Sequence, residues 1–149
     1  MLRTPIALIL LVIAAAAVSA DAPKPEAVIH YRQSVYKVML WNWVPMAEMM
    51  KGKRPFEAAE FKRRAERMAA ATRYLDEAYA EGSGQGAETD ALPAIWENRK
   101  DFDGKLEDMQ REAQELAQTA ASGDEAKIKE QFGKTANSCK ACHDKYRAD

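Results

Sequence analysis

The sequence predicts an all-α protein that folds as an antiparallel up-and-down four-helix bundle. Three observations favour this fold. Four segments carry apolar residues at alternating steps of three and four, no segment shows the strict alternation of a half-buried strand, and most connections are short. Amphipathic helices joined by short connections bury their apolar faces best against antiparallel neighbours.

An N-terminal segment precedes the expected bundle. Arg3, the apolar run of residues 6–18 and the small-residue tripeptide of residues 18–20 are typical of a secretory signal peptide. A membrane anchor is the alternative, but the apolar run is short and ends in a cleavage-type tripeptide. We therefore predict a signal peptide over residues 1–20 and a periplasmic bundle over residues 21–149, with no membrane span after cleavage.

The first helical segment spans residues 24–51 and contains a proline. Apolar positions continue on both sides of Pro45, which removes one backbone hydrogen bond and crowds the preceding turn. We therefore expect one kinked helix rather than two separate helices. The second segment spans residues 55–81, with Pro55 in its first turn, where a proline is tolerated.

The third and fourth helical segments span residues 92–121 and 124–147. The stretch "EGSGQG", residues 81–86, separates them from the first two segments and is the longest flexible connection. Gly123 and Asp124 form a helix stop and an N-cap side by side. The last two helices are therefore expected to be tight antiparallel neighbours.

Charge and composition exclude some classes of function. The chain has 22 basic and 23 acidic residues, so no basic excess points to nucleic acid. No nucleophile with a general base is visible among its residues, so we do not expect an enzyme.

The two cysteines of the chain lie in the motif Cys139-Lys-Ala-Cys142-His143. A Cys139–Cys142 disulfide would close too small a loop to restrict the unfolded chain much. A thioredoxin-like redox pair expects a βαβ context, and a zinc site lacks ligands, because only His30 could complete the set.

The motif instead favours covalent attachment of one haem c. Cysteines three apart on a helix project from the same face, so each sulfur can add to one vinyl group, and His143 can bind the iron. Both cysteines continue the apolar stripe of Phe132 and Tyr146. We therefore expect the haem inside the bundle, where it replaces side chains as core.

Three stretches resemble the cytochrome c′ family of exported single-haem four-helix bundles. These are "SCKACHDKYR" (residues 138–147), "YRQSVYKVM" (residues 31–39) and "IWENRKDF" (residues 95–102). The resemblance implies that Cys139 and Cys142 form the thioethers. It also implies a homodimer through the first two helices.

The resemblance assigns roles to five further residues. Arg147 would lie beside the iron-binding histidine, Arg32 and Gln33 would contact the haem propionates, Tyr36 would cover the open iron face, and Met39 would line the same pocket. The residues alone leave alternatives: Arg147 also suits a helix C-terminus. Arg32 needs a partner such as a carboxylate near the apolar stripe, or is simply solvated.

The residue type at position 36 determines which coordination of the haem iron we expect. Low-spin relatives carry a methionine at this place as a second axial ligand, whereas a neutral phenol is a poor ligand for ferrous iron. We therefore predict a five-coordinate, high-spin haem that binds diatomic gases, nitric oxide above all and carbon monoxide, and exchanges single electrons with an unidentified redox partner. The alternatives are a low-spin, methionine-ligated electron carrier of the same fold, and a haem-free binding bundle with a Cys139–Cys142 disulfide.

The stretch "LWNWVPM" departs from the family, which commonly has small residues there. Packing is the simplest expectation for Trp41 and Trp43.

Overall fold

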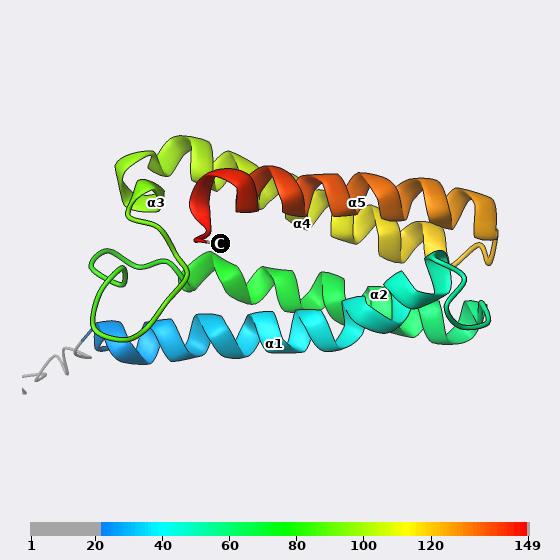
Figure 1. Ribbon diagram of the computed structural model, residues 1–149, viewed down its shortest axis with the longest axis horizontal. Helices are drawn as coiled ribbons and strands as arrows, with labels where there is room; N and C mark the ends of the chain where they lie inside the picture. The colour runs from blue at the N-terminus through cyan, green and yellow to red at the C-terminus, as the bar shows by residue number, and fades with distance from the viewer. Residues whose placement is uncertain (1–21, 149) are drawn as a thin grey trace, which may run out of the picture.

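The computed structural model describes residues 22–148, and the predicted signal peptide lies outside these residues. Its helices are α1 (Pro25–Met50), α2 (Ala58–Thr72), the 3₁₀ turn η1 (Arg73–Glu77), α3 (Ala94–Glu97), α4 (Arg99–Ala120) and α5 (Glu125–Tyr146). The four long helices run up and down beside one another (Figure 1). The predicted four-helix bundle is therefore confirmed. Within the described part of the chain, no helix is both long and apolar enough to span a membrane.

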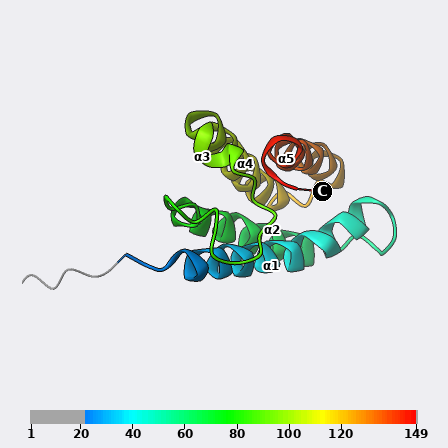
Figure 2. The same cartoon turned by 60° about the vertical axis from the view of Figure 1, so that its left-hand side comes forward.

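The four helices do not approach one another equally. The backbone of α1 packs against α2, α2 against α4 and α4 against α5, whereas α1 and α5 approach less closely (Figure 2). At one end of the bundle this fourth side is closed by Trp43 of α1, which stacks on Phe132 of α5 with 4.1 Å between ring centroids. Trp41 instead is 76% exposed, so the expectation that both tryptophans pack is wrong for Trp41.

Pro45 does not divide the first helix, as the continuous apolar stripe predicts. The carbonyl of Trp41, four residues earlier, receives no N–H from Pro45. Nη1 of Arg64, on α2, donates to this carbonyl at 3.3 Å. A neighbouring helix thus supplies the missing donor.

The second and third predicted segments differ in detail from the structure. Helix α2 begins at Ala58, three residues after Pro55, and ends in the 3₁₀ turn η1. The third segment is divided at Asn98, whose φ of −122° and ψ of 45° separate α3 from α4. Asn98 then also donates its side-chain amide to the carbonyl of Ala94.

Two connections follow the turn chemistry of the sequence. Between α4 and α5, Gly123 has a φ of +70°, and Asp124 caps α5 by accepting the backbone N–H groups of Ala126 and Lys127. In the glycine-rich stretch, a Cβ on Gly84 would lie 2.9 Å from the Trp96 ring. Gly84 therefore lets the connection pass close to α3.

Candidate functional site

The last turns of α5 carry the cysteine motif. Cys139 and Cys142 are half-buried free thiols that pack against the core, and the next residue, His143, is exposed. Phe132 and Tyr146 are buried on the same stripe. Burial raises the pKa of Cys139, and burial together with the neighbouring Cys139 raises the pKa of Cys142 to about 11. Both thiols are therefore protonated near neutral pH.

Two tyrosines lie next to these thiols. The hydroxyls of Tyr36, on α1, and Tyr79, just after η1, are 2.8 Å apart, so one donates to the other. Burial first, and then Tyr79, hold the pKa of Tyr36 well above its usual value, and negative charge on Cys139 or Cys142 would raise it further. Burial also raises the pKa of Tyr79. Both phenols are therefore neutral at physiological pH.

Sequence reasoning missed Tyr79 as a site residue. Its position on the apolar stripe of the second segment made it look like an ordinary core residue. A buried phenol nevertheless needs a hydrogen-bond partner for its hydroxyl. This need for a hydrogen-bond partner was the sequence feature that could have pointed to Tyr79, but it does not show that the partner is Tyr36.

Arg32 is a buried cation in the same region. It is only 2% exposed, and its Nη1 donates to the carbonyl of Ala78 at 2.9 Å and to Oγ of Ser83 at 3.4 Å. Its Nη2 donates to the carbonyl of Ser83 and to Oγ1 of Thr89, both at 3.1 Å. The expectations of a carboxylate partner or a solvated side chain are therefore both wrong. Carbonyl and hydroxyl oxygens of the connection after η1 satisfy the guanidinium instead.

The structure separates the other predicted site residues. Gln33 donates to the carbonyl of Glu88 at 2.9 Å, beside the partners of Arg32, and Met39 is buried in the apolar core. Arg147 is exposed just after α5, with its Nε 4.0 Å from a carboxylate oxygen of Asp90. Burial and the charge of Arg147 lower the pKa of His143. Arg147 thus lies near His143, whereas Arg32 and Gln33 anchor the connection after η1.

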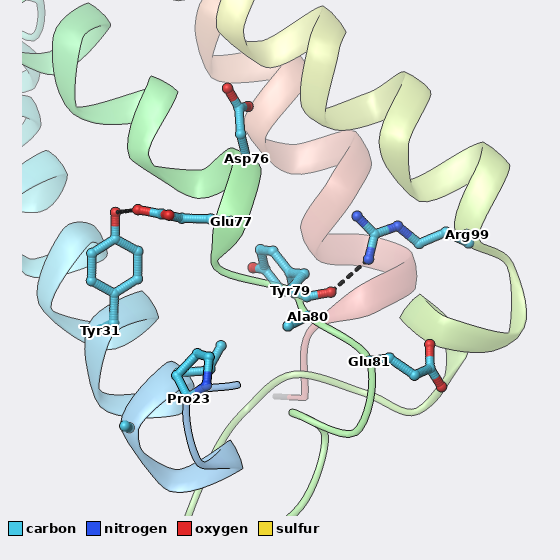
Figure 3. Close-up of a pocket in the computed structure, with 10 residues that line it drawn as sticks. Pro23, Tyr31, Asp76, Glu77, Tyr79, Ala80, Glu81 and Arg99 are labelled. Atoms are coloured by element: carbon cyan, nitrogen blue, oxygen red, sulfur yellow. Dashed lines mark hydrogen bonds between the residues drawn. The ribbon is translucent and has the colours of Figure 1, made fainter. Parts of the chain in front are cut away.

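Tyr79 also forms part of a surface cavity of about 580 Å³ between the start of α1, η1 and the start of α4 (Figure 3). Nη1 of Arg99 donates to the carbonyl of Tyr79 at 2.6 Å. On the opposite wall, the hydroxyl of Tyr31 donates to Glu77 at 2.8 Å. Tyr79 thus contributes to the lining of this cavity and also contacts the Tyr36 hydroxyl.

This arrangement fits a covalently attached haem. The two thiols share one face of α5, they lie close to Tyr36, and α1 and α5 form the side of the bundle where the backbones approach least. The lowered pKa of His143 favours the neutral imidazole that binds iron. Among residues 22–148, no group of three or more histidine, cysteine and acidic side chains is arranged to hold a metal ion by itself.

Comparisons with known proteins agree with this geometry. Residues 27–147 match the family model described as "Cytochrome C'". A cytochrome c′ of Halomonas halodenitrificans is 40% identical over 131 residues, which are 85% of this chain and 99% of that protein. The solved cytochrome c prime of Shewanella frigidimarina has a TM-score of 0.83 and 40% identity, covering 87% of this chain and all of that one. A nitric oxide complex of a mutant cytochrome c prime from Alcaligenes xylosoxidans has a TM-score of 0.78 and 33% identity, over 87% of this chain and 99% of that one.

Proposed function

The chain belongs to the cytochrome c′ family, and on this premise we propose that it is a periplasmic haem protein that binds small diatomic gases and passes single electrons. The observation that carries the proposal is the placement of the Cys139-Lys-Ala-Cys142-His143 motif next to Tyr36, on the α1–α5 side of the bundle. A nitric oxide complex of a relative supports gas binding. The proposed role is binding and electron transfer, with no catalytic residue assigned.

Cys139 and Cys142 hold one haem c in this proposal. Each sulfur would form a thioether bond with a vinyl carbon of the haem, and the thiol hydrogen would pass to the neighbouring vinyl carbon. His143 would provide a nitrogen ligand to the iron, and burial first, then the charge of Arg147, lower the pKa of its imidazole and so favour the neutral form. The haem supplies an iron that binds gases and changes oxidation state.

Tyr36 would lie over the gas-binding face of the haem without binding the iron. Its phenol is neutral and already shares a hydrogen bond with Tyr79, and a neutral phenol binds ferrous iron poorly. Met39, which is buried in the core three residues after Tyr36, would line the same pocket. A side chain in this place would have to move before a gas could bind, so Tyr36 would control access to the iron.

Arg32 and Gln33 are proposed to lie at the propionate edge of the haem. Arg32 remains charged although burial lowers its pKa, because a guanidinium keeps its proton in proteins. The Arg32 guanidinium lies 4.8 Å from the centre of the Tyr79 ring, and Gln33 donates to the carbonyl of Glu88 in the same connection that holds Arg32. A haem propionate would replace one of the neutral oxygen acceptors of these side chains. Because the propionate is charged, it would accept a stronger hydrogen bond.

The proposal includes a homodimer in which a second copy covers α1. Val38, Leu40, Trp41 and Val44 are exposed apolar side chains on one side of this helix. Trp41→Lys is expected to shift the protein to monomers in sedimentation experiments, because a buried lysine would remain uncompensated. An unchanged mass at micromolar concentration would exclude this surface.

The experiment that tests the proposed function is the visible spectrum of protein exported to the periplasm, in its ferric, ferrous and ferrous-nitrosyl states. We expect a high-spin spectrum, a nitric oxide adduct, and a mass equal to residues 21–149 plus one haem. Cys139→Ser combined with Cys142→Ser should abolish covalent attachment. A colourless product contradicts the proposal, and a sharp methionine-ligated low-spin signature supports the electron-carrier alternative instead.

A further inference from the structure

Separate contacts hold each part of Tyr79 in place. Its carbonyl accepts a hydrogen bond from Arg99 at 2.6 Å (Figure 3). One edge-to-face contact joins its ring to Phe102, with 4.6 Å between centroids, and the guanidinium of Arg32 lies 4.8 Å from the ring centre. The side chain is only 6% exposed. The hydroxyl that meets Tyr36 is therefore fixed in position.

The single hydrogen bond between the two phenols has a preferred direction. Only one hydroxyl donates across the 2.8 Å separation. Arg32 lies over the ring of Tyr79, and its positive charge makes the hydroxyl of that phenol the more acidic one. Burial raises the pKa of both phenols; at Tyr79 the hydrogen bond with Tyr36 and then the charge of Arg32 oppose this rise, whereas the pKa of Tyr36 is held well above its usual value. Either hydroxyl could donate across this distance. The more acidic hydroxyl is the better donor, which favours donation from Tyr79 to Tyr36.

We propose that Tyr79 is a positioning residue that donates to Tyr36 and thereby leaves the Tyr36 hydrogen free to be donated to a diatomic ligand at the iron. This inference rests on the proposed function and extends it to the choice of ligand. If Tyr36 instead donated its hydrogen to Tyr79, only the lone pairs of the Tyr36 oxygen would face the ligand. Donation stabilises ligands whose outer atom carries partial negative charge, and a chain of two hydroxyls strengthens it.

Carbon monoxide bound to the ferrous protein is the probe for this proposal. The measurements are the C–O stretching frequency, its change in D₂O, and the rate of CO dissociation. The variants are Tyr79→Phe, Tyr36→Phe and the double variant, each of which removes only a hydroxyl. Tyr31→Phe is the matched control, because Tyr31 lies on the same helix as Tyr36 but donates to Glu77 instead.

The wild-type C–O stretch is expected to be lowered and to shift in D₂O. Tyr79→Phe should move the frequency most of the way to the Tyr36→Phe value and speed CO dissociation about 2- to 10-fold, as for one lost hydrogen bond. The double variant should equal Tyr36→Phe, because Tyr79 acts only through Tyr36. Tyr31→Phe should match the wild type.

Other outcomes overturn the inference without touching the proposed function. These are a Tyr79→Phe variant with the wild-type frequency, a further shift when Tyr79→Phe is added to Tyr36→Phe, or a wild-type frequency insensitive to D₂O. The D₂O measurement needs no substitution, so it applies even if Tyr79→Phe fails to fold. A wild-type protein that carries haem but forms no CO adduct contradicts the proposed function itself.

Discussion

The two ends of the bundle are filled by different kinds of side chain. The end formed by the last turns of α1 and α4 and the first turns of α2 and α5 is apolar, with Phe61, Phe132 and Leu116 closely packed. The other end holds the buried Arg32, the Tyr36–Tyr79 pair and the thiols of Cys139 and Cys142. The first end thus stabilises the fold by apolar burial, whereas the second buries polar groups beside the two thiols.

The largest effect on stability is expected at the apolar end, from Phe61→Ala. Phe61 is fully buried and contacts the rings of Phe56 and Phe132, so the substitution leaves a cavity. We expect the free energy of unfolding to fall by about 3–5 kcal/mol. Urea unfolding measures it, and the visible spectrum should not change. Phe56→Ala, at a less buried ring of the same end, is the control; an equal loss there would mean that the depth of burial does not set the size of the effect.

Arg32→Met tests the polar end. It removes the donors for Ala78, Ser83 and Thr89 and leaves buried oxygens without a partner. We expect a loss of about 1–3 kcal/mol in the free energy of unfolding. In contrast to Phe61→Ala, it should also change the visible spectrum and speed proteolysis within residues 81–89. Arg32→Lys keeps the positive charge but loses several of the guanidinium donors, so its free energy of unfolding should lie between those of the wild type and Arg32→Met. If Arg32→Met lowers the stability but leaves the visible spectrum unchanged, the guanidinium has no role at the site.

Asn42 is a polar residue in the middle of α1, between the two ends. Its Nδ2 donates to the carbonyl of Val38 at 2.9 Å, but its buried Oδ1 has no donor among the described residues. Asn42→Leu is expected to raise the free energy of unfolding by about 1 kcal/mol, since it removes an unsatisfied acceptor. Thermal unfolding measures the change, with Ser34→Ala, at an exposed position of α1, as the control. A destabilised Asn42→Leu variant would mean that the oxygen has a partner, such as a buried water.

The smallest effect is expected from Asp101, at the exposed rim of the polar end. The hydroxyl of Tyr146 and Nζ of Lys145 both donate to it, and they hold its pKa below 3.8. A carboxyl with a depressed pKa stabilises the folded state above its unfolded pKa, and this contribution is lost as the pH falls through the folded value. Asp101→Asn should therefore flatten the stability profile below pH 4, measured by acid unfolding. If Glu115→Gln on the same helix flattens it equally, the effect is one of net charge.

Local patterns predicted most of the fold. The 3.6-residue periodicity, Gly123 and the Asp124 cap predicted the last two helices within a few residues, because these signals act over one or two turns. The break at Asn98 was missed, since α3 and α4 share one continuous apolar stripe. The exposure of Trp41 was missed too, because an apolar side chain alone does not tell whether a neighbour covers it.

The sequence by itself determined the motif that we propose attaches the haem, since two cysteines three apart and the next histidine need only one helix to form the site. Tertiary structure alone decided what surrounds that motif. Tyr36 and Tyr79 are 43 residues apart, and Arg32 and Ser83 are 51 apart. Such contacts depend on the relative positions of whole helices and connections, which no local pattern encodes. From the sequence alone, the arginine is interpreted as a solvated residue and the tyrosines as ordinary core residues.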